Sequence, residues 1–347
     1  NPVEYNGIKF FNKDGYKLDD EIELQIEKYI DDIEKVDCNP VGENVGIINH
    51  EHNALRDYVD YLKSIINVDL TGMKIVLDCA NGASYEVAPI VFKELGANVI
   101  DINTTPNGKN INDKCGSTHP EMLQKVVVEN KADLGLAYDG DADRLIAVDE
   151  NGNIVDGDHI MVLSAIHLKN KGKLAQDTLV VTVMSNIGLT IAAKEHGINL
   201  ATTAVGDRYV LEEMKNSGYN LGGEQSGHMI FLDYNTTGDG VLSSLVLAQI
   251  VLEEGKNLSE LAAVMTQYPQ VLVNARIKNE NKNRYMEYPE IKSEIERIEK
   301  LLDGCGRVLI RPSGTEPLVR VMLEGKEEGQ IKELATNLAN LIQEKLS

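Results

Sequence analysis

Short apolar, β-branched runs alternate along the chain with amphipathic stretches, and turn-forming residues separate them. Strand, helix and strand patterns follow one another twice, at residues 73–80, 81–97 and 98–103 and again at 178–184, 185–198 and 199–206. Each time, an Asn-Gly or Asn-Ile-Gly turn follows the first strand, as expected at the carboxyl end of a strand in a β-α-β unit. We therefore predict two homologous α/β domains of the same plan.

The end of the chain has a different pattern. Helical periodicity at 292–304 and 330–346 flanks two runs, 306–314 and 318–325, that have the pattern of a β-hairpin. The polar stretch 278–289 lacks periodicity and predicts a flexible connection. Together these segments indicate a smaller α+β domain at the C-terminus, after the repeated α/β domains.

Composition narrows the classes of partner. The chain has 347 residues, of which 42% are hydrophobic and 26% are charged, as in an ordinary globular protein. Its formal net charge of −21 would repel a polyanion, so we expect no nucleic-acid partner. The sequence has neither an apolar run long enough to span a membrane nor the pattern of a signal peptide, and we expect no membrane partner.

The cysteines and histidines do not have the spacing of a metal site. Cys38, Cys79, Cys115 and Cys305 lie far apart and form no C-x-x-C pair, and the histidines form no H-x-x-x-H pattern. This spacing argues against a disulfide framework and against a zinc site. We expect reduced thiols and a cytoplasmic protein.

An acidic loop lies between two predicted strands. Asp139, Asp141 and Asp143 stand at alternate positions, with Arg144 directly behind them. A calcium EF-hand is excluded, although Glu150 stands where its last ligand would be, because Arg144 replaces the required glycine and strands flank the loop. A solvated acidic turn is the alternative. The tight spacing favours a cage of three carboxylates for Mg²⁺, with one position left for a phosphate oxygen.

A second group of polar residues follows a predicted strand near the C-terminus. The strand leads from Arg311 into a turn made of Ser313, Gly314 and Thr315, where hydroxyl and backbone N–H groups converge. Arg311 offers a planar fork for phosphate oxygens, and Arg320 offers a second fork from the next strand. A plain hairpin turn explains the same residue types, since Pro, Ser and Gly are common turn formers.

The glycine-rich stretch `GGEQSGH` places Glu224, Ser226 and His228 at alternate positions. Glycines let a backbone approach a ligand closely, and a carboxylate and a hydroxyl suit the hydroxyls or amine of a sugar. A glycine-rich bulge with a structural histidine is the alternative. Asp207 and Arg208, in a turn between a strand and a helix, add one more candidate polar contact.

Four motifs, `DGDADR`, `VGDRY`, `GGEQSGH` and `RPSGTEP`, occur in this order along essentially the whole chain. Together they resemble the loops of the α-D-phosphohexomutase family, and `GEQSGH` and `RPSGTEPLVRVM` are most similar to its phosphoglucosamine mutase branch. The resemblance implies an α/β fold with repeated α/β domains that have mixed sheets, plus a smaller C-terminal α+β domain, around a central cleft. The expected domains are a remnant of the serine-loop domain at 1–65, a metal-loop domain at 66–155, a sugar-loop domain at 156–268 and a phosphate-binding domain at 269–347.

The resemblance also assigns roles to residues. It implies that Asp139, Asp141 and Asp143 bind Mg²⁺, and that Lys9, in `YNGIK`, lies next to the reacting phosphate as a catalytic residue. A surface lysine on a strand is the alternative for Lys9. The implied substrate-binding residues are Arg144, Asp207, Arg208, Glu224, Ser226, His228, Arg311, Ser313, Gly314, Thr315 and Arg320.

The implied activity is that of an intramolecular phosphotransferase of the isomerase class. It would interconvert glucosamine 6-phosphate and glucosamine 1-phosphate through a phosphoserine and a bisphosphate, and feed amino-sugar nucleotide and cell-wall synthesis. The expected partners are therefore a hexosamine phosphate and its bisphosphate, and a homodimer is left open. Phosphomannomutase or phosphoglucomutase activity is the alternative within the family.

Relatives carry the nucleophilic serine in a segment resembling S-x-S-H-N-P. Asn1 and Pro2 match the end of this segment, so the serine and its histidine lie outside the printed sequence. We accordingly expect the printed chain to be inactive by itself, with a metal loop that is empty, hydrated or loosely occupied. A non-catalytic sugar-phosphate-binding fragment and a generic Mg²⁺ phosphohydrolase are the remaining alternatives.

Overall fold

The computed structural model describes residues 3–5, 7–32, 40–66, 68–302, 304–313 and 316–346. The chain forms two compact units, one from residues 1–183 and 199–263 and the other from residues 184–198 and 264–347. The α-helices of the described residues are α1 (Asp20–Asp31), α2 (Ala54–Ile65), α3 (Val87–Glu94), α4 (Glu121–Asn130), α5 (Gly157–Asn170), α6 (Ile187–Glu195), α7 (Asp207–Ser217), α8 (Gly240–Glu254), α9 (Leu258–Ala262), α10 (Pro289–Leu302) and α11 (Glu328–Leu346). The strands are β1 (Lys74–Asp78), β2 (Asn98–Ile102), β3 (Leu134–Tyr138), β4 (Leu145–Val148), β5 (Ile154–Val155), β6 (Thr178–Thr182), β7 (Asn199–Thr203), β8 (Leu221–Gly223), β9 (Met229–Phe231), β10 (Gln270–Arg276), β11 (Arg307–Pro312) and β12 (Leu318–Glu324).

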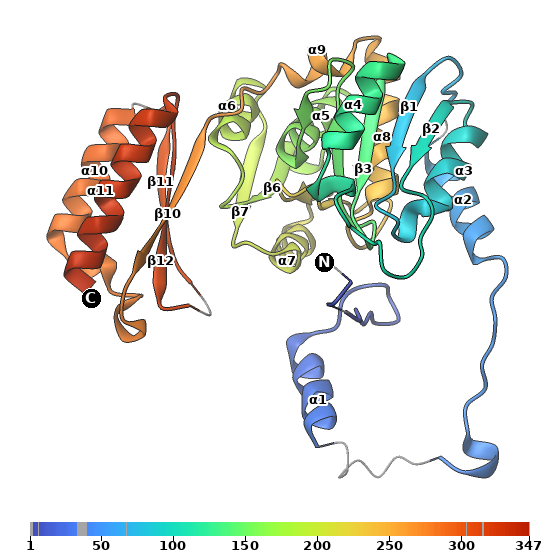
Figure 1. Ribbon diagram of the computed structural model, residues 1–347, viewed down its shortest axis with the longest axis horizontal. Helices are drawn as coiled ribbons and strands as arrows, with labels where there is room; N and C mark the ends of the chain where they lie inside the picture. Colours follow the sequence, from blue (N-terminus) through green and yellow to red (C-terminus); the bar gives the residue numbers. More distant parts are fainter. Residues whose placement is uncertain are drawn as a thin grey trace. The chain divides into compact units, whose positions relative to one another are not determined.

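The first sheet has the order β2-β1-β3-β4-β5. β1 is parallel to both β2 and β3, whereas β4 is antiparallel to β3 and to β5 (Figure 1). β3 is buried along its whole length and β1 nearly so, which explains why their sequences are continuous apolar runs. The strands expected at 73–80 and 98–103 are confirmed, and the helix expected between them is a 3₁₀ turn followed by α3.

The second sheet repeats this plan with the order β7-β6-β8-β9. The central strand β6 is parallel to β7 and β8, and β9 is antiparallel to β8. In each sheet, the strand that comes first in the sequence, β1 or β6, lies between two parallel neighbours. An antiparallel strand, β4 or β9, then extends the sheet on one side. The two sheets are therefore mixed, and the predicted pair of homologous α/β folds is confirmed.

Helix α8 joins the two sheets of the first unit. It contacts β3 and β4 of one sheet and β9 of the other, and it also packs against α5. Its sequence is apolar on all sides, which is the composition of a helix that is buried all round. The side chain of Asp239 accepts a hydrogen bond from Leu242 N at 2.9 Å and so caps the first turn of α8.

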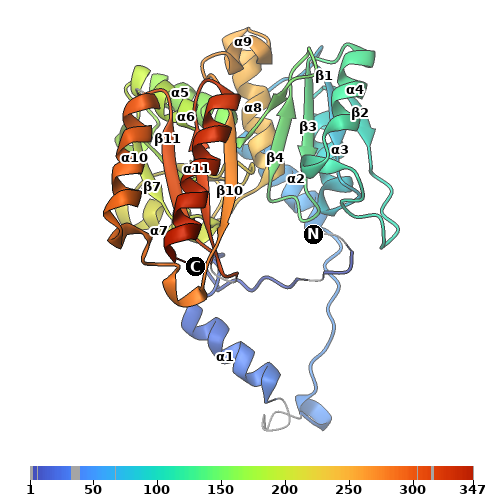
Figure 2. The ribbon, with the colours of Figure 1, turned by 60° about the vertical axis from the view of Figure 1, so that its left-hand side comes forward.

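The second unit contains the antiparallel sheet β10-β12-β11. Helices α10 and α11 pack on the sheet through one apolar core, and the two views show them covering one face (Figures 1 and 2). The predicted hairpin is the β11–β12 pair, and the predicted helices are α10 and α11. At 278–289, where a flexible connection is expected, two 3₁₀ turns form and Tyr285 packs against the core.

Glu324, at the end of β12, is fully buried and ties α6 to this sheet. Its carboxylate accepts hydrogen bonds from Arg307 Nε at 2.5 Å, Ile187 N at 3.2 Å and Gln270 Nε2 at 3.3 Å. The Arg307 guanidinium also donates to the carbonyl oxygen of Ser185 at 2.6 Å. The Glu324 carboxylate thus connects the start of α6 with Gln270 on β10 and Arg307 on β11.

Replacing Glu324 by alanine is expected to lower the free energy of unfolding of this unit by about 3 kcal/mol, because it leaves a partly buried guanidinium and an amide without their acceptor. Calorimetric or denaturant unfolding measures the change. Glu333→Ala on the exposed face of α11 is the control, with an expected change within about 0.5 kcal/mol. Equal stabilities of the two variants would contradict the role given to Glu324.

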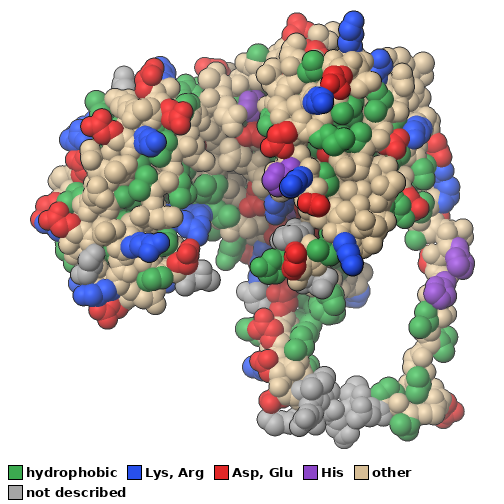
Figure 3. All heavy atoms as spheres, in the orientation of Figure 1, with side chains coloured by type: hydrophobic (Ala, Val, Ile, Leu, Met, Phe, Trp, Pro, Cys, Tyr) green, Lys and Arg blue, Asp and Glu red, His purple; other side chains and the backbone are tan. Residues whose placement is uncertain are grey.

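The N-terminal segment carries several exposed apolar side chains, visible as green spheres along it in Figure 3. The most exposed of these are Ile8, Val41, Ile47 and Ile48. Among the described residues, none of the helices has both the length and the apolar character needed to cross a membrane.

Candidate active site

The acidic loop connects β3 to β4 and gathers its three carboxylates. One oxygen from each of Asp139, Asp141 and Asp143 lies within 4.8 Å of the others. The turn is tight because Ala142 adopts a positive φ of 60° and because Arg144 N donates to Asp139 Oδ1 at 3.1 Å. A cluster of hard oxygen donors at this spacing fits a small divalent cation such as Mg²⁺.

Lys9 lies directly against this cluster. Its Nζ donates to Asp141 Oδ2 and to Asp143 Oδ2, both at 2.7 Å, although more than 130 residues separate it from them in sequence. Burial by itself lowers the pKa of Lys9, but the hydrogen bonds to the two carboxylates outweigh this effect and raise the pKa above its ordinary value. The lysine therefore carries a positive charge at the edge of the loop.

The cluster still has an excess of negative charge. Burial, followed by the repulsion of Asp143 and Asp141, raises the pKa of Asp139 to about 7. Burial also opposes ionisation of Asp143, but contacts with His228 and Lys9 prevail and hold its pKa below the usual range. One carboxyl is thus poorly stabilised as an anion even with Lys9 in place, and a divalent cation would supply the missing charge.

The glycine-rich loop between β8 and β9 packs against the acidic loop. Arg144 and His228 form an antiparallel bridge, and Leu145 N donates to Gly227 O at 3.0 Å. Gly240 N donates to Ala142 O at 2.9 Å, which fixes the other side of the acidic loop. Two motifs that are distant in sequence therefore form one surface in the first unit.

His228 lies between two carboxylates and is only 3% exposed. Its Nδ1 is 3.4 Å from Asp143 Oδ2, and its Nε2 is 3.6 Å from Asp207 Oδ2. A side chain on Gly238 would collide with the ring, since a Cβ there would lie 2.4 Å from it. The structure therefore places His228 behind the site, where it links the acidic loop to α7.

The other residues predicted for the sugar site differ in their burial and in their contacts. Glu224 Oε1 accepts from Gly206 N at 3.0 Å, and the Ser226 side chain is exposed. Asp207 begins α7 and faces His228, whereas Arg208 donates through Nε to Glu212 at 2.8 Å along the surface of the helix. Glu224 thus contacts the residue before α7, Asp207 contacts His228, and Arg208 pairs with Glu212 along its own helix.

The predicted phosphate-binding residues lie in the second unit. Arg311 and Arg320 are directly paired across β11 and β12, so their side chains leave the same face of the sheet. Ser313 is buried, and its Oγ accepts from Glu316 N at 3.1 Å. Gly314 and Thr315 lie outside the described residues, as do Asn1 and Pro2.

Four family models match consecutive parts of the chain. They describe the phosphoglucomutase/phosphomannomutase domains, with domain I at 1–37, domain II at 56–152, domain III at 156–268 and the C-terminal domain at 272–341. A phosphoglucosamine mutase of Clostridioides difficile (strain 630) is 82% identical over all 347 residues, which cover 78% of that protein. The chain belongs to the phosphoglucosamine mutases of the phosphohexomutase family. A second member, from Thermoanaerobacter sp. (strain X514), is 63% identical over the full chain and 77% of its own length.

Solved structures share the fold of this phosphoglucosamine mutase family chain. The crystal structure of an Aspergillus fumigatus N-acetylphosphoglucosamine mutase in complex with GlcNAc-6P and magnesium matches with a TM-score of 0.77 and 19% identity, over 100% of this chain and 88% of that one. A phosphoglucomutase/phosphomannomutase family protein from Burkholderia thailandensis matches with a TM-score of 0.74 and 22% identity, over 95% and 71% of the two chains.

Sequence reasoning missed Lys17 in this phosphoglucosamine mutase chain. It ends a short hairpin closed by the bridge between Phe11 and Lys17, and its Nζ pairs with Asp207. Thr236 Oγ1 donates to Gly15 O at 2.6 Å, and Lys215 lies over the ring of Tyr16. The hairpin that follows Lys9 is therefore anchored on α7, and no pattern in the sequence indicates this pairing.

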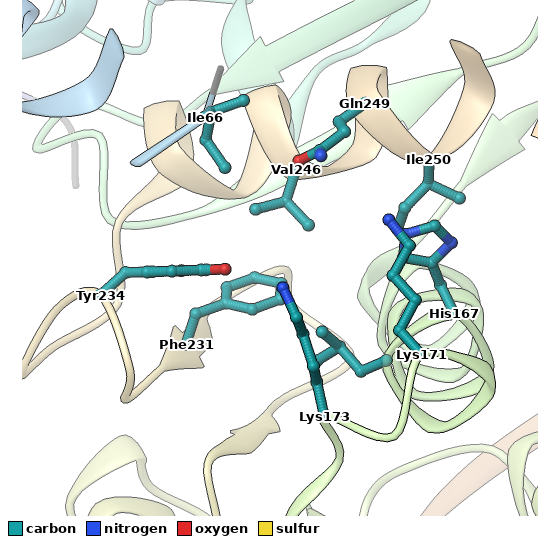
Figure 4. Close-up of a pocket in the computed structure, with 10 residues that line it drawn as sticks. Ile66, His167, Lys171, Lys173, Phe231, Tyr234, Val246, Gln249 and Ile250 are labelled. Carbon is teal, nitrogen blue, oxygen red and sulfur yellow. The ribbon is translucent and has the colours of Figure 1, made fainter. Parts of the chain in front are cut away.

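A separate hollow in the first unit does not suit the family's substrates. Figure 4 shows Phe231 and Tyr234 on one wall and His167 and Lys171 on the opposite wall. Its volume is about 40 Å³, enough for about one water molecule and far too small for a hexose phosphate. His167 and Lys171 are already paired with Glu253.

Proposed function

We propose that this protein is an intramolecular phosphotransferase that interconverts glucosamine 6-phosphate and glucosamine 1-phosphate with Mg²⁺ as cofactor. The observation that carries the proposal is the cluster in which Lys9, the carboxylates of Asp139, Asp141 and Asp143, and the glycine-rich loop meet in one unit. The 82% identity to a phosphoglucosamine mutase supports the choice of substrate.

The site has the charges that phosphoryl transfer needs. Asp139, Asp141 and Asp143 would hold Mg²⁺, which when bound would neutralise charge on the transferring phosphoryl group. Lys9 presents its ammonium to the same space, where it stabilises the developing charge or moves a proton at the sugar oxygen. Arg144 Nε has no hydrogen-bond partner among the described residues and lies 3.9 Å from Asp139 Oδ2 and 3.8 Å from Asp143 Oδ1, so its guanidinium would add positive charge for a phosphate oxygen.

The binding roles follow from the chemistry of each side chain. Glu224 and Ser226 would bind the hydroxyls or the amine of the sugar, and Asp207, Arg208 and His228 would add further polar contacts to the substrate. Arg311 and Arg320 would bind the phosphate that does not react, together with Ser313, Gly314 and Thr315. Because the bisphosphate must return its other phosphate to the phosphoserine, each group has to accept the sugar in two orientations.

Substrate preference tests the proposal. Turnover by the full-length gene product is measured with glucosamine 6-phosphate, glucose 6-phosphate and mannose 6-phosphate in matched coupled assays. We expect kcat/KM to be higher for glucosamine 6-phosphate by a factor of about 10 or more, since a site built to pair an amine discriminates against an analogue without it. A preference for glucose or mannose phosphate would support the phosphoglucomutase or phosphomannomutase alternative. Steady release of inorganic phosphate would indicate a phosphohydrolase.

The remaining predictions concern the setting of the enzyme. We propose a cytoplasmic location, supported by Cys79, Cys115 and Cys305, which are free thiols in the structure. A role in amino-sugar nucleotide and cell-wall synthesis and assembly as a homodimer stay predictions, as does the division into domains at 1–65, 66–155, 156–268 and 269–347. Light scattering of the purified full-length protein measures the assembly.

A further inference from the structure

Asp78, at the end of β1, is a buried carboxylate for which the proposed mechanism has no use. Its side chain is 0% exposed, and no lysine, arginine or histidine among the described residues pairs with it. Its oxygens instead accept three hydrogen bonds, each 3.0 Å long, from Ala80 N, Asn103 Nδ2 and Gly116 N. Burying an acid is costly, so a carboxylate held only by neutral donors calls for an explanation.

These donors belong to backbone segments in an unfavourable conformation. Ala80, Asn81 and Asn103 all have positive φ values near 50°, and Gly116 has a φ of 72°. A residue with a side chain costs of order 1 kcal/mol or more in this region, so the surrounding contacts must impose it. Asp78 supplies such contacts, because its carboxylate accepts hydrogen bonds from Ala80 N, from the side chain of Asn103 and from Gly116 N.

The same segments enclose the backbone of the acidic loop. Ala83 N donates to Gly140 O at 2.9 Å, and a Cβ on Gly82 would lie 2.3 Å from that oxygen. On the other side, a Cβ on Gly116 would lie 2.4 Å from Tyr138 O. The backbone from Tyr138 to Gly140 is thus held between two segments with no room for side chains, and Asp78 is bonded to both.

Asn112 closes the same arrangement. Its N donates to Ala80 O at 2.9 Å, and its Nδ2 lies 2.5 Å from where a Cβ of Gly140 would be. The backbone around Ala80, Asn112 and Gly116 therefore forms a layer that positions the acidic loop. Asp78 holds this layer through its hydrogen bonds to Ala80 and Gly116. A displacement of this layer would move Asp139 and Asp141 relative to Asp143.

We propose that Asp78 is a positioning residue that sets the spacing of the Asp139, Asp141 and Asp143 carboxylates through the backbone on either side of Gly140. The inference rests on the metal site of the proposed function. It differs from a purely structural role of Asp78 in that its loss weakens cation binding even where the fold persists. Residues that orient the ligands of a metal in this way usually contribute ten-fold or more to its affinity.

The test compares two buried aspartates in the full-length protein. Asp78→Asn keeps the size of the side chain, but its NH₂ group replaces one acceptor oxygen and would face a backbone N–H that needs an acceptor. Asp149→Asn is the matched control, since Asp149 is 3% exposed and accepts from Asn151 N, Asn153 N and Asn153 Nδ2 at 2.8–3.0 Å in the β4–β5 turn. Mg²⁺ binding is measured by calorimetry and by the rise of the unfolding temperature with Mg²⁺.

We expect Asp78→Asn to raise the Kd for Mg²⁺ about ten-fold, and Asp149→Asn to change it by less than about two-fold although it loses a similar number of hydrogen bonds. A folded Asp78→Asn variant with the wild-type Kd would overturn the inference. If that variant does not fold, Asn103→Gly decides, because it keeps the positive φ and removes one donor, and a Kd unchanged from wild type again overturns the inference. Absence of Mg²⁺ binding by the wild type would instead overturn the metal site, and the inference with it.

Discussion

Replacing Asp143 by asparagine is expected to lower kcat for glucosamine 6-phosphate by about 10²–10³-fold, the range found when one preorganised electrostatic group is removed from an active site. Asp143 Oδ2 is 2.7 Å from Lys9 Nζ and 3.4 Å from His228 Nδ1, so its charge serves the cation and both neighbours. Asparagine is a weaker and neutral ligand. The Mg²⁺ concentration for half-maximal activity should therefore rise in the same variant, and excess Mg²⁺ should restore part of the activity.

Asp101→Asn is the control for this variant. Asp101 lies on β2 of the same sheet, where it pairs with Lys93 at 3.0 Å on the surface, and its loss is expected to change kcat by less than about two-fold. An Asp143→Asn enzyme with wild-type turnover and an unchanged Mg²⁺ requirement would contradict the assignment of this carboxylate to the metal site.

The sequence was sufficient for the elements that have a clear period. The strands at 74–78 and 178–182 and the helices α10 and α11 stand close to their predicted positions, because apolar periodicity reports which face of an element is buried. It did not indicate the 3₁₀ turns at 278–289, where the composition is polar. There Lys282 Nζ donates to Ser313 O at 3.0 Å and Asn281 donates to Leu346 O, and such long-range bonds are not visible in composition.

The same distinction applies to the site. Spacing was enough to group Asp139, Asp141 and Asp143, since neighbours in a tight turn must be neighbours in space. The contact of Lys9 with them was expected only through a family resemblance, because no local rule relates residues so far apart in the chain. Asp78 could not be singled out, since an aspartate after an apolar strand looks like any turn residue until its donors are known.

The side chains of the glycine-rich loop `GGEQSGH` differ in burial. The alternation of Glu224, Ser226 and His228 predicted a sugar-binding loop, with a bulge that contains a structural histidine as the alternative. In the structure Ser226 is exposed, whereas His228 is 3% exposed and contacts Asp143 and Asp207. Ser226 of this loop therefore faces solvent, whereas His228 links the acidic loop to α7. The alternating pattern in the sequence could not separate these two roles.

Replacing Lys9 by methionine is expected to change turnover and cation binding in opposite directions. Lys9 Nζ stands 2.7 Å from Asp141 Oδ2 and from Asp143 Oδ2, so it stabilises anionic charge in the site and also repels a divalent cation there. A unit charge and a dication about 5 Å apart repel by ~1–2 kcal/mol in water, which corresponds to about a ten-fold change in affinity. Methionine keeps most of the length of the side chain and removes the charge together with the two hydrogen bonds that Nζ donates.

We therefore expect Lys9→Met to lower kcat by about 10²–10³-fold, as the loss of a general acid or charge-stabilising group does, while the Kd for Mg²⁺ falls by up to about ten-fold. Lys13→Met is the matched control, because Lys13 lies four residues further on, is 89% exposed and pairs only with Asp14 among the described residues. Steady-state kinetics and calorimetric Mg²⁺ titration are run on the same preparations. A parallel loss of turnover and of Mg²⁺ affinity would mean that Lys9 acts by holding the acidic loop together. Opposite changes would mean that it acts on the transferring phosphoryl group, because only a charge that competes with the cation yet serves the reaction gives both signs.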